Sequence, residues 1–124
     1  VKGEVSAVKV HEDMDVLAFL DIHPVNPGHT LVMPKQHYAT IFDLSEAVLG
    51  KVMSVVKKVA IAVDTLADGV NISQNNRGPA GQVVDHVHFH VIPRLRSDGL
   101  RHWPGKAYRD GEAEEVAKRI KSLL

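Results

Sequence analysis

The chain has 124 residues, of which 44% are apolar and 24% charged, and this composition is typical of a globular domain with its own core. Fifteen basic and fifteen acidic residues give a net charge of zero, which argues against a nucleic-acid-binding protein, because such proteins are usually basic. The sequence contains no cysteine, so it offers no disulfide and no thiolate metal ligand, and this fits a reducing, cytoplasmic location. No apolar run approaches the roughly 20 residues of a membrane span, so no membrane partner is expected.

Alternating apolar residues and turn signals predict five strands. They are expected at residues 5–10, 15–22, 29–33, 70–74 and 83–92, with a turn at 11–13 and loops at 24–28 and 75–81. Short turns between strands, with one long helix inserted, predict an α+β fold with a five-stranded antiparallel sheet. No linker divides the chain, so residues 1–124 are expected to form one domain, with 95–124 as its tail.

A long helix is the strongest prediction. Asp43 stands three residues before Glu46, which is the spacing of an N-terminal cap, and Gly69 is well placed to end the helix. An apolar stripe at helical spacing predicts the face that packs on the sheet: Val48, Val52, Val55, Val56, Val59, Val63 and Leu66. After an irregular stretch, a short terminal helix is expected to start at Asp110.

Three histidines alternate with apolar residues in the last predicted strand. Since side chains on a strand point to opposite faces with a period of two, His86, His88 and His90 would share one face while Val87 and Phe89 pack into the core. Imidazole has an ordinary pKa of about 6.5, so such a group suits phosphate chemistry or a metal site. A Zn²⁺ site with an open water position and a solvated strand face are the alternatives.

Nucleophilic attack on a nucleotide α-phosphorus is the chemistry that fits this group best. A neutral imidazole nitrogen attacks phosphorus without bringing a further negative charge, and neighbouring histidines stabilise the phosphate oxygens and protonate the leaving group. The preceding residues 75–82 hold amides and glycines that let the backbone approach a ligand. They hold no metal-ligating carboxylate, which favours phosphate over a metal.

The segment that ends at Arg94, Gly81-Gln82-Val83-Val84-Asp85-His86-Val87-His88-Phe89-His90-Val91-Ile92-Pro93-Arg94, resembles the signature of the histidine-triad (HIT) family. In that signature, single apolar residues separate three histidines, and two further apolar residues follow the third histidine. Residues 17–22, 27–35 and 71–75 agree with other parts of the family pattern. The resemblance implies the HIT-like fold, with the long helix packed on the sheet, and a homodimer in which two copies continue the sheet.

The resemblance also implies a role for each histidine of the site. His88 matches the nucleophile, His90 the histidine that contacts the phosphate oxygens, and His86 the first triad histidine, which supports the site and relays a proton. His29 matches a fourth histidine that contacts the first. Three further histidines have no assigned role and are expected on the surface or in loops: His11, His23 and His37.

Further residues match nucleotide-binding positions of the family. Asp21 matches an acid that binds the ribose hydroxyls, although capping a turn is its alternative role. Two amides match groups near the phosphate, and three apolar residues match positions around the base: Asn75, Gln82, Phe19, Leu20 and Ile22. Residues 99–105 resemble a His-Trp-Pro segment of Hint-type members, in which the tail of one subunit approaches the site of the other. Trp103 is therefore a nucleotide-binding candidate, with a core aromatic as its alternative.

The chain departs from the family pattern at two places that affect chemistry. Val83 stands where many members have Ser or Thr, so no hydroxyl assists the leaving group there. Many bacterial and archaeal members carry a Cys-x-x-Cys zinc motif just before the segment that matches Val1, but this sequence contains no cysteine. No cofactor is therefore expected, and no metal-binding residue is assigned.

The resemblance implies hydrolysis or transfer at the α-phosphorus of purine nucleoside phosphoramidates, or of related nucleoside monophosphate conjugates, through a nucleotidyl-histidine intermediate. A substrate derived from adenosine or guanosine is expected. Hydrolysis of dinucleoside polyphosphates uses the same intermediate and is the alternative enzyme activity. A nucleotide-binding regulator with little turnover is the alternative of a different class.

Overall fold

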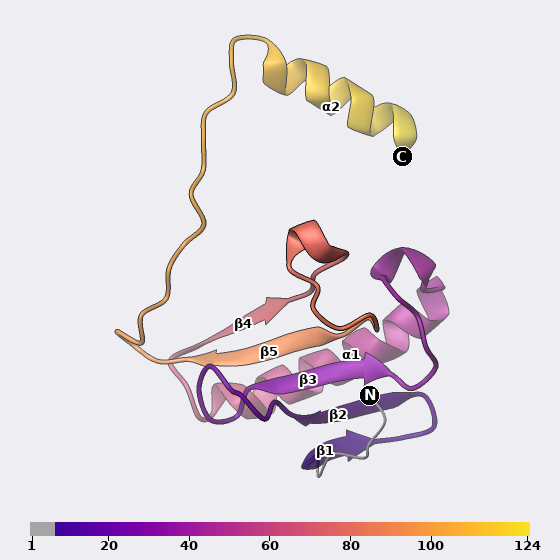
Figure 1. Cartoon of the computed structure of the whole chain (residues 1–124), viewed down its shortest axis with the longest axis vertical. Coiled ribbons are helices and arrows are strands. Elements are labelled where there is room, and N and C mark those ends of the chain that lie inside the picture. The colour runs from indigo at the N-terminus through magenta and orange to yellow at the C-terminus, as the bar shows by residue number, and fades with distance from the viewer. Residues whose placement is uncertain (1–6) are drawn as a thin grey trace.

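One antiparallel sheet and one long helix make up the body of the chain (Figure 1). The computed structural model describes residues 7–124. The strands are β1 (Lys9–Glu12), β2 (Val16–Leu20), β3 (Thr30–Pro34), β4 (Gly69–Ser73) and β5 (Phe89–Arg94), and they lie in the order β1-β2-β3-β5-β4. All four pairings are antiparallel. In this order β1 and β4 form the two edges of the sheet. The predicted fold class is confirmed.

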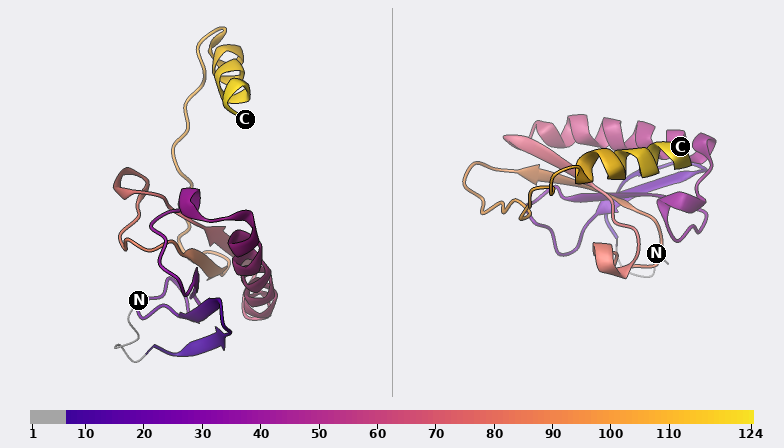
Figure 2. Two further views of the ribbon diagram at one scale, coloured as in Figure 1. Left: turned by 90° about the vertical axis from the view of Figure 1, so that its right-hand side faces the viewer. Right: turned by 90° about the horizontal axis from the view of Figure 1, so that it is seen from above.

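Helix α1 (Glu46–Asp64) covers one face of the sheet, and the opposite face is open (Figure 2). The predicted apolar stripe is buried at Val52, Val55, Val56, Val59 and Val63, and these side chains pack against residues of β2, β3 and β5. The prediction is wrong at Leu66, which lies beyond the end of the helix and is 65% exposed. Valine is a weak helix former because its β-branched side chain restricts rotamers. Burial of this stripe on the sheet is therefore what stabilises the helix.

The ends of α1 differ from the prediction. Ser45, not Asp43, is the N-cap, and its hydroxyl accepts a hydrogen bond from the amide of Val48. Asp43 instead closes the short 3-10 helix η1 (Ile41–Asp43), where its carboxylate accepts bonds from Thr40. The helix ends at Asp64, before Gly69, which belongs to β4. Because the carboxylate of Asp43 already accepts from Thr40, the hydroxyl of Ser45 is the group that caps α1.

Two strand predictions are wrong in their bounds. Part of the predicted strand 5–10 lies outside the described residues, and β1 runs on through His11 and Glu12, where a turn was expected. The predicted strand 83–92 begins only at Phe89, because residues 83–88 form a bent segment without ladder pairing. Only the last of the three histidines therefore lies on a strand.

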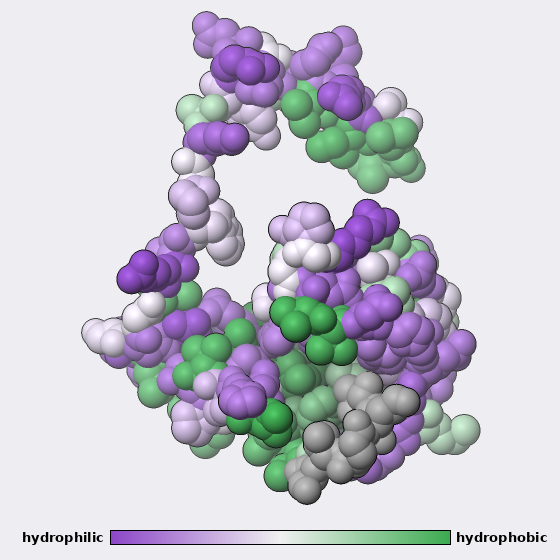
Figure 3. Space-filling model, in the orientation of Figure 1, coloured by the Kyte–Doolittle hydropathy of each residue, from purple (hydrophilic) through white to green (hydrophobic). Residues whose placement is uncertain are grey.

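The tail leaves the end of β5 and extends away from the sheet before it forms α2 (Glu112–Leu123) (Figure 1). None of the α2 residues is buried. Its apolar side chains gather on one side of the helix, where Ile120 is 54% and Leu123 86% exposed (Figure 3). Within residues 7–124, no helix combines the length and apolar character that a membrane crossing requires.

Candidate active site

The register of the sheet places His90 on the open face. His90 lies opposite Leu31 of β3, which in turn lies opposite Phe19 of β2, so the three side chains share the face that α1 leaves uncovered. The neighbouring residues Phe89 and Val91 point the other way and are buried under the helix. Strand alternation thus separates the catalytic candidate from the core, as predicted for this part of the sequence.

His88 lies just before the strand, with its ring centroid 5.0 Å from that of His90. Its Nδ1 donates a hydrogen bond to the backbone carbonyl oxygen of His86 at 2.7 Å. A carbonyl only accepts, so the proton of the neutral ring stays on Nδ1 and the lone pair lies on Nε2. His88 therefore presents an unprotonated ring nitrogen, which is the form a nucleophile needs.

His86 does not stand in a row with the other two histidines. It is buried, and its Nε2 donates to the backbone carbonyl oxygen of Pro34 at 2.9 Å. Its Nδ1 is then the acceptor, and His37 Nδ1 donates to it at 3.0 Å. The expectation of three histidines on one strand face is wrong, because the chain bends before β5 and turns this ring toward the end of β3.

His37 is a residue that the sequence analysis missed. It is an exposed loop residue, as expected, but its ring lies 5.1 Å from that of His86, centroid to centroid, and this contact was not predicted. The two residues are 49 positions apart, and their contact depends on the path of the chain between β3 and η1. No local pattern carries that information. The other two unassigned histidines have no contact with the triad in the described residues.

His29 contacts the third triad histidine rather than the first, which corrects the expectation. Its Nε2 lies 3.0 Å from Nδ1 of His90, and Asp21 Oδ2 lies 3.6 Å from the same Nε2. The backbone amide of Val25 donates to His29 Nδ1 at 3.1 Å. An amide only donates, so the proton of neutral His29 is on Nε2, from where it is donated to His90. His90 therefore carries its own proton on Nε2.

Burial keeps these histidines neutral. Loss of water around the ring lowers the pKa of His29, and the nearby carboxylate of Asp21 only partly opposes this. Burial also lowers the pKa of His90, and the rings of His88 and His29 lower it further. Burial also lowers the pKa of His86, and the hydrogen bond to Pro34, which raises it, opposes this only in part. The site thus combines neutral rings with defined tautomers at neutral pH.

Asp21, His29 and His90 are the one group in the described residues whose ligand atoms lie close enough to hold a metal, within 4.8 Å of one another. The hydrogen bonds of His29, however, are not compatible with metal binding. Because His29 Nδ1 accepts the amide of Val25, Nε2 carries the proton and has no lone pair for a metal. The three triad histidines do not converge on a point either, since His86 Nε2 donates to Pro34.

The side-chain amides of Gln82 and Asn75 differ in how many of their hydrogen-bonding groups are already used. Gln82 Nε2 donates to the carbonyl oxygens of Ala39 and Val84, and its Oε1 accepts the amide of Arg77. The side chain of Gln82 thus holds the loop, and both of its N–H groups are used. Asn75 makes one long bond of 3.5 Å to Gly81. Of the two predicted amides, Asn75 is the one with hydrogen-bonding capacity left for a ligand.

The apolar candidates fall into buried and exposed groups. Phe19 is buried on the open-face side of the sheet, Leu20 is half-buried, and Ile22 is 67% exposed in the loop after β2. Trp103 is 86% exposed in the tail, which leads away from the sheet. Val83 is 93% exposed at the start of the bent segment before the triad. The core-aromatic alternative for Trp103 is wrong.

Adjacent histidines on the open face of a sheet, whose other face is covered by one long helix, agree with the histidine-triad class expected from the sequence. Comparison with known families agrees, since the HIT domain model matches residues 2–97. The chain belongs to the HIT family.

Two curated relatives cover nearly the whole chain. A HIT-like protein of Methanocaldococcus jannaschii is 45% identical over 122 residues, which are 98% of this chain and 94% of the relative. Adenosine 5'-monophosphoramidase hnt1 of Schizosaccharomyces pombe is 41% identical over 126 residues, covering 100% of this chain and 93% of the relative. Relatives at about this level of identity thus include adenosine 5'-monophosphoramidases.

A solved structure supports the fold over the same length. The crystal structure of a HIT family member from Bacillus subtilis superposes with a TM-score of 0.89 at 34% identity, covering 98% of this chain and 91% of that one. The match includes the C-terminal helix as well as the sheet and the long helix. The HIT-like architecture expected from the sequence is confirmed.

Proposed function

We propose that this protein hydrolyses purine nucleoside phosphoramidates, or related nucleoside monophosphate conjugates, at the α-phosphorus. The observation that carries the proposal is the tautomer of His88, whose Nδ1 proton is held by the His86 carbonyl while Nε2 is free to attack. The monophosphoramidase relative from Schizosaccharomyces pombe supports adenosine 5'-phosphoramidate as the first substrate to test.

The reaction has two displacement steps. His88 Nε2 forms a bond to phosphorus as the bond from phosphorus to the leaving nitrogen breaks, and the leaving amine takes up a proton from solvent as it departs. Water then attacks the nucleotidyl-histidine, releasing the nucleoside monophosphate and restoring the neutral ring. His90 Nε2–H donates to a phosphate oxygen in both steps and stabilises the charge that develops there.

Asp21 and Asn75 complete the proposed substrate site. Asp21 follows β2, its Oδ1 accepts the amide of His23, and its other oxygen faces His29. This arrangement leaves the carboxylate at the edge of the histidine group, where we propose that it binds the ribose hydroxyls. Asn75 is proposed to bind the phosphate, with Phe19 and the residues after it near the base.

The proposed reaction uses no metal. The tautomers of His29 and His86 give those rings N–H donors where a metal site would need lone pairs. Activity that is unchanged after treatment with a strong chelator, in protein shown to be metal-free, is the expected result. Loss of activity on metal removal, with recovery on adding Zn²⁺, would contradict it.

We further propose that the protein works as a homodimer. In the described residues strand β4 is an edge with one neighbour, and beside it a mostly apolar groove runs between β4 and α1. Met53, Ala60, Ile61, Val70 and Ile72 line it, together with the charged residues Lys57 and Asp64. A second copy that pairs its own β4 with this edge continues the sheet and covers the groove. In such a dimer, the tail of one copy is proposed to bring Trp103 to the site of the other.

Mass spectrometry of a rapidly quenched reaction tests the mechanism. With adenosine 5'-phosphoramidate, we expect an adenylyl group on a peptide that contains His88, and none in the His88→Ala variant. Diadenosine polyphosphate is tested beside it, since faster turnover of that substrate would identify the alternative hydrolase. Full turnover by His88→Ala would contradict the proposal, and nucleotide binding without any adduct or turnover would indicate a regulator.

A further inference from the structure

A side chain outside the triad joins the loop before His29 to the end of β5. Asn26 Nδ2 donates to the backbone carbonyl oxygen of Pro93 at 2.9 Å and to Asp98 Oδ2 at 2.8 Å. Both of its N–H groups are thus used, one on the end of β5 and one on the turn that follows it. The next turn of that segment is closed by a backbone bond from Asp98 to Leu95.

Asp98 is itself held in place from several directions. Arg94 donates to it twice, from Nε at 2.9 Å and from Nη2 at 2.7 Å, and the amide of Leu95 donates to Oδ2 at 2.9 Å. The guanidinium of Arg94 holds the pKa of Asp98 far below the usual range, so the carboxylate is ionised. The side chain of Asp98 is only 9% exposed, so this is a fixed anchor.

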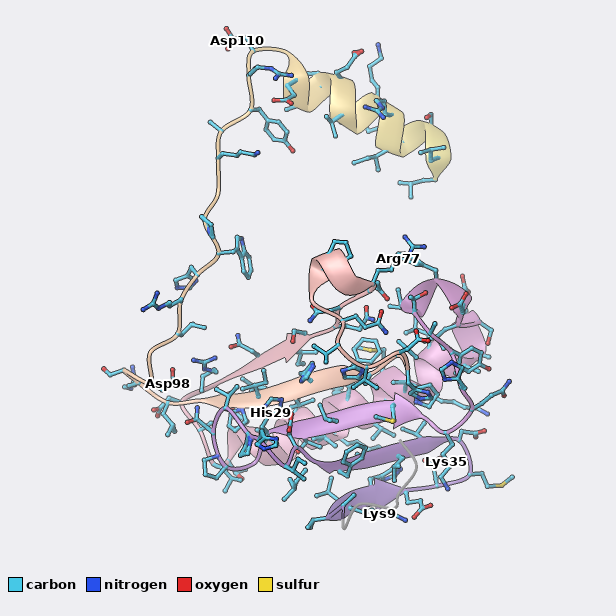
Figure 4. The ribbon with its side chains drawn as sticks, in the orientation of Figure 1. Lys9, His29, Lys35, Arg77, Asp98 and Asp110 are labelled. Atoms are coloured by element: carbon cyan, nitrogen blue, oxygen red, sulfur yellow. The ribbon has the colours of Figure 1, made fainter. Side chains whose placement is uncertain are left out.

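Asn26, which these bonds hold, is next in sequence to Val25, whose amide orients His29. Val25, directly before Asn26, donates its amide to His29 Nδ1, and the backbone carbonyl of Asn26 accepts the amide of His29 at 3.0 Å. The loop from 24 to 28 therefore folds around His29 and is fastened on its far side by Asn26. Figure 4 shows His29 and Asp98 toward the same end of the sheet.

We propose that Asn26 and Asp98 are positioning residues, which set the tautomers of His29 and His90 by holding the Val25 amide on His29. If that amide moved away, His29 could place its proton on Nδ1 and accept a hydrogen bond at Nε2. His90 would then donate from Nδ1, and its Nε2 would turn a lone pair toward the phosphate. The tautomers follow from contacts alone, whereas their effect on turnover rests on the proposed function.

Nuclear magnetic resonance of ¹⁵N-histidine in the full chain tests this directly. Long-range ¹H–¹⁵N correlation distinguishes the two neutral tautomers, measured at a pH about one unit above the ordinary histidine value. We expect Nε2–H for His29 and His90 in the wild type. In Asn26→Asp, which keeps the size but loses both donors, and in Asn26→Ala, we expect the tautomer ratio of both rings to change by about tenfold toward Nδ1–H.

A matched control lies at the same end of the sheet. Asp68 Oδ2 accepts the amide of Arg96 at 2.9 Å but makes no bond to Asn26, so Asp68→Ala is expected to leave the tautomers as in the wild type. Unchanged tautomers in both folded Asn26 variants would overturn the proposal. So would a wild-type Nδ1–H tautomer at His29.

Turnover of adenosine 5'-phosphoramidate separates this inference from the proposed function. We expect kcat of the Asn26 variants to fall in proportion to the fraction of His90 that remains Nε2–H, while KM changes little. A tautomer change without any change in kcat would overturn the catalytic part of the inference. A wild type that turns over no nucleotide would contradict the proposed function but leave the tautomer result as it stands.

Discussion

Nδ1 of His88 lies 2.7 Å from the backbone carbonyl oxygen of His86, so the main chain, not a side chain, orients the proposed nucleophile. The imidazole of His86 points elsewhere, to the carbonyl oxygen of Pro34 and to His37. One residue thus supplies two separate functions. Its carbonyl fixes the tautomer of His88, and its ring fixes the bent segment before β5 against the end of β3.

Substitution separates these two functions. His86→Ala keeps the carbonyl, so we expect turnover to fall only about 10- to 100-fold, as when a supporting partner of a reacting group is removed. His88→Ala removes the nucleophile and should lower kcat by about 10⁴-fold or more. Steady-state kinetics of both variants measure the difference. Equal losses would indicate that the His86 ring takes part in the chemistry.

His86→Ala should also destabilise the fold. The variant leaves the carbonyl of Pro34 without its donor in a buried position, which costs about 1–3 kcal/mol in the free energy of unfolding. Urea unfolding measures this loss. His88→Ala is the control, since His88 is only half-buried and its bond is local, and it should lose less.

Asp21→Asn tests the proposed ribose contact. The asparagine side chain still accepts the bond from the backbone amide of His23 but carries no charge. We therefore expect KM for adenosine 5'-phosphoramidate to rise about tenfold, with a smaller effect on kcat. The matched substrate lacks the ribose 2'- and 3'-hydroxyls. If Asp21 binds those hydroxyls, the wild type and the variant should handle that substrate alike, and a persisting difference would contradict the contact.

Stability should depend on pH through the buried histidines. The pKa values of His29, His86 and His90 lie below the ordinary 6.5 in the folded chain, chiefly because the rings are buried. Between 6.5 and the lowered folded values, the unfolded chain binds protons that the folded chain does not. The free energy of unfolding should therefore be highest above pH 6.5 and fall as the pH decreases through that window.

Urea unfolding at a series of pH values measures this fall. The variant His90→Asn removes one of the three rings whose pKa is lowered by loss of water, so its free energy of unfolding should depend less steeply on pH in the same window. A wild type whose free energy stays level from above pH 6.5 down to about 5 would contradict the lowered pKa values.

Charge placed in the groove between α1 and β4 should separate the proposed dimer. Ile61 is 61% and Ile72 50% exposed there, so lysine is tolerated in a single copy but not in a covered interface. We expect Ile61→Lys and Ile72→Lys to sediment as monomers while the wild type sediments as a dimer. Met14→Lys is the control, because Met14 is 91% exposed and lies outside this groove. A monomeric wild type would contradict the dimer.

The sequence predicted the parts of the molecule that depend on local periodicity. The valine stripe of α1 and the buried residues beside the triad are where their spacing placed them. The bent segment was missed because alternating apolar residues look like a strand whether or not a neighbouring chain pairs with them. The contacts from His29 to His90 and from His37 to His86 join residues 61 and 49 positions apart, so only the folded path of the chain reveals them.

Main-chain groups set the tautomers of three histidines: the amide of Val25 and the carbonyls of Pro34 and His86. Every amino acid has a carbonyl, and every one except proline has an amide, so positions 25 and 34 can change identity while the tautomers persist. Genetic drift at these two positions should leave the chemistry intact as long as the course of the backbone is kept. A saturation library at position 25 should therefore reject proline far more strongly than any change of side-chain size or polarity.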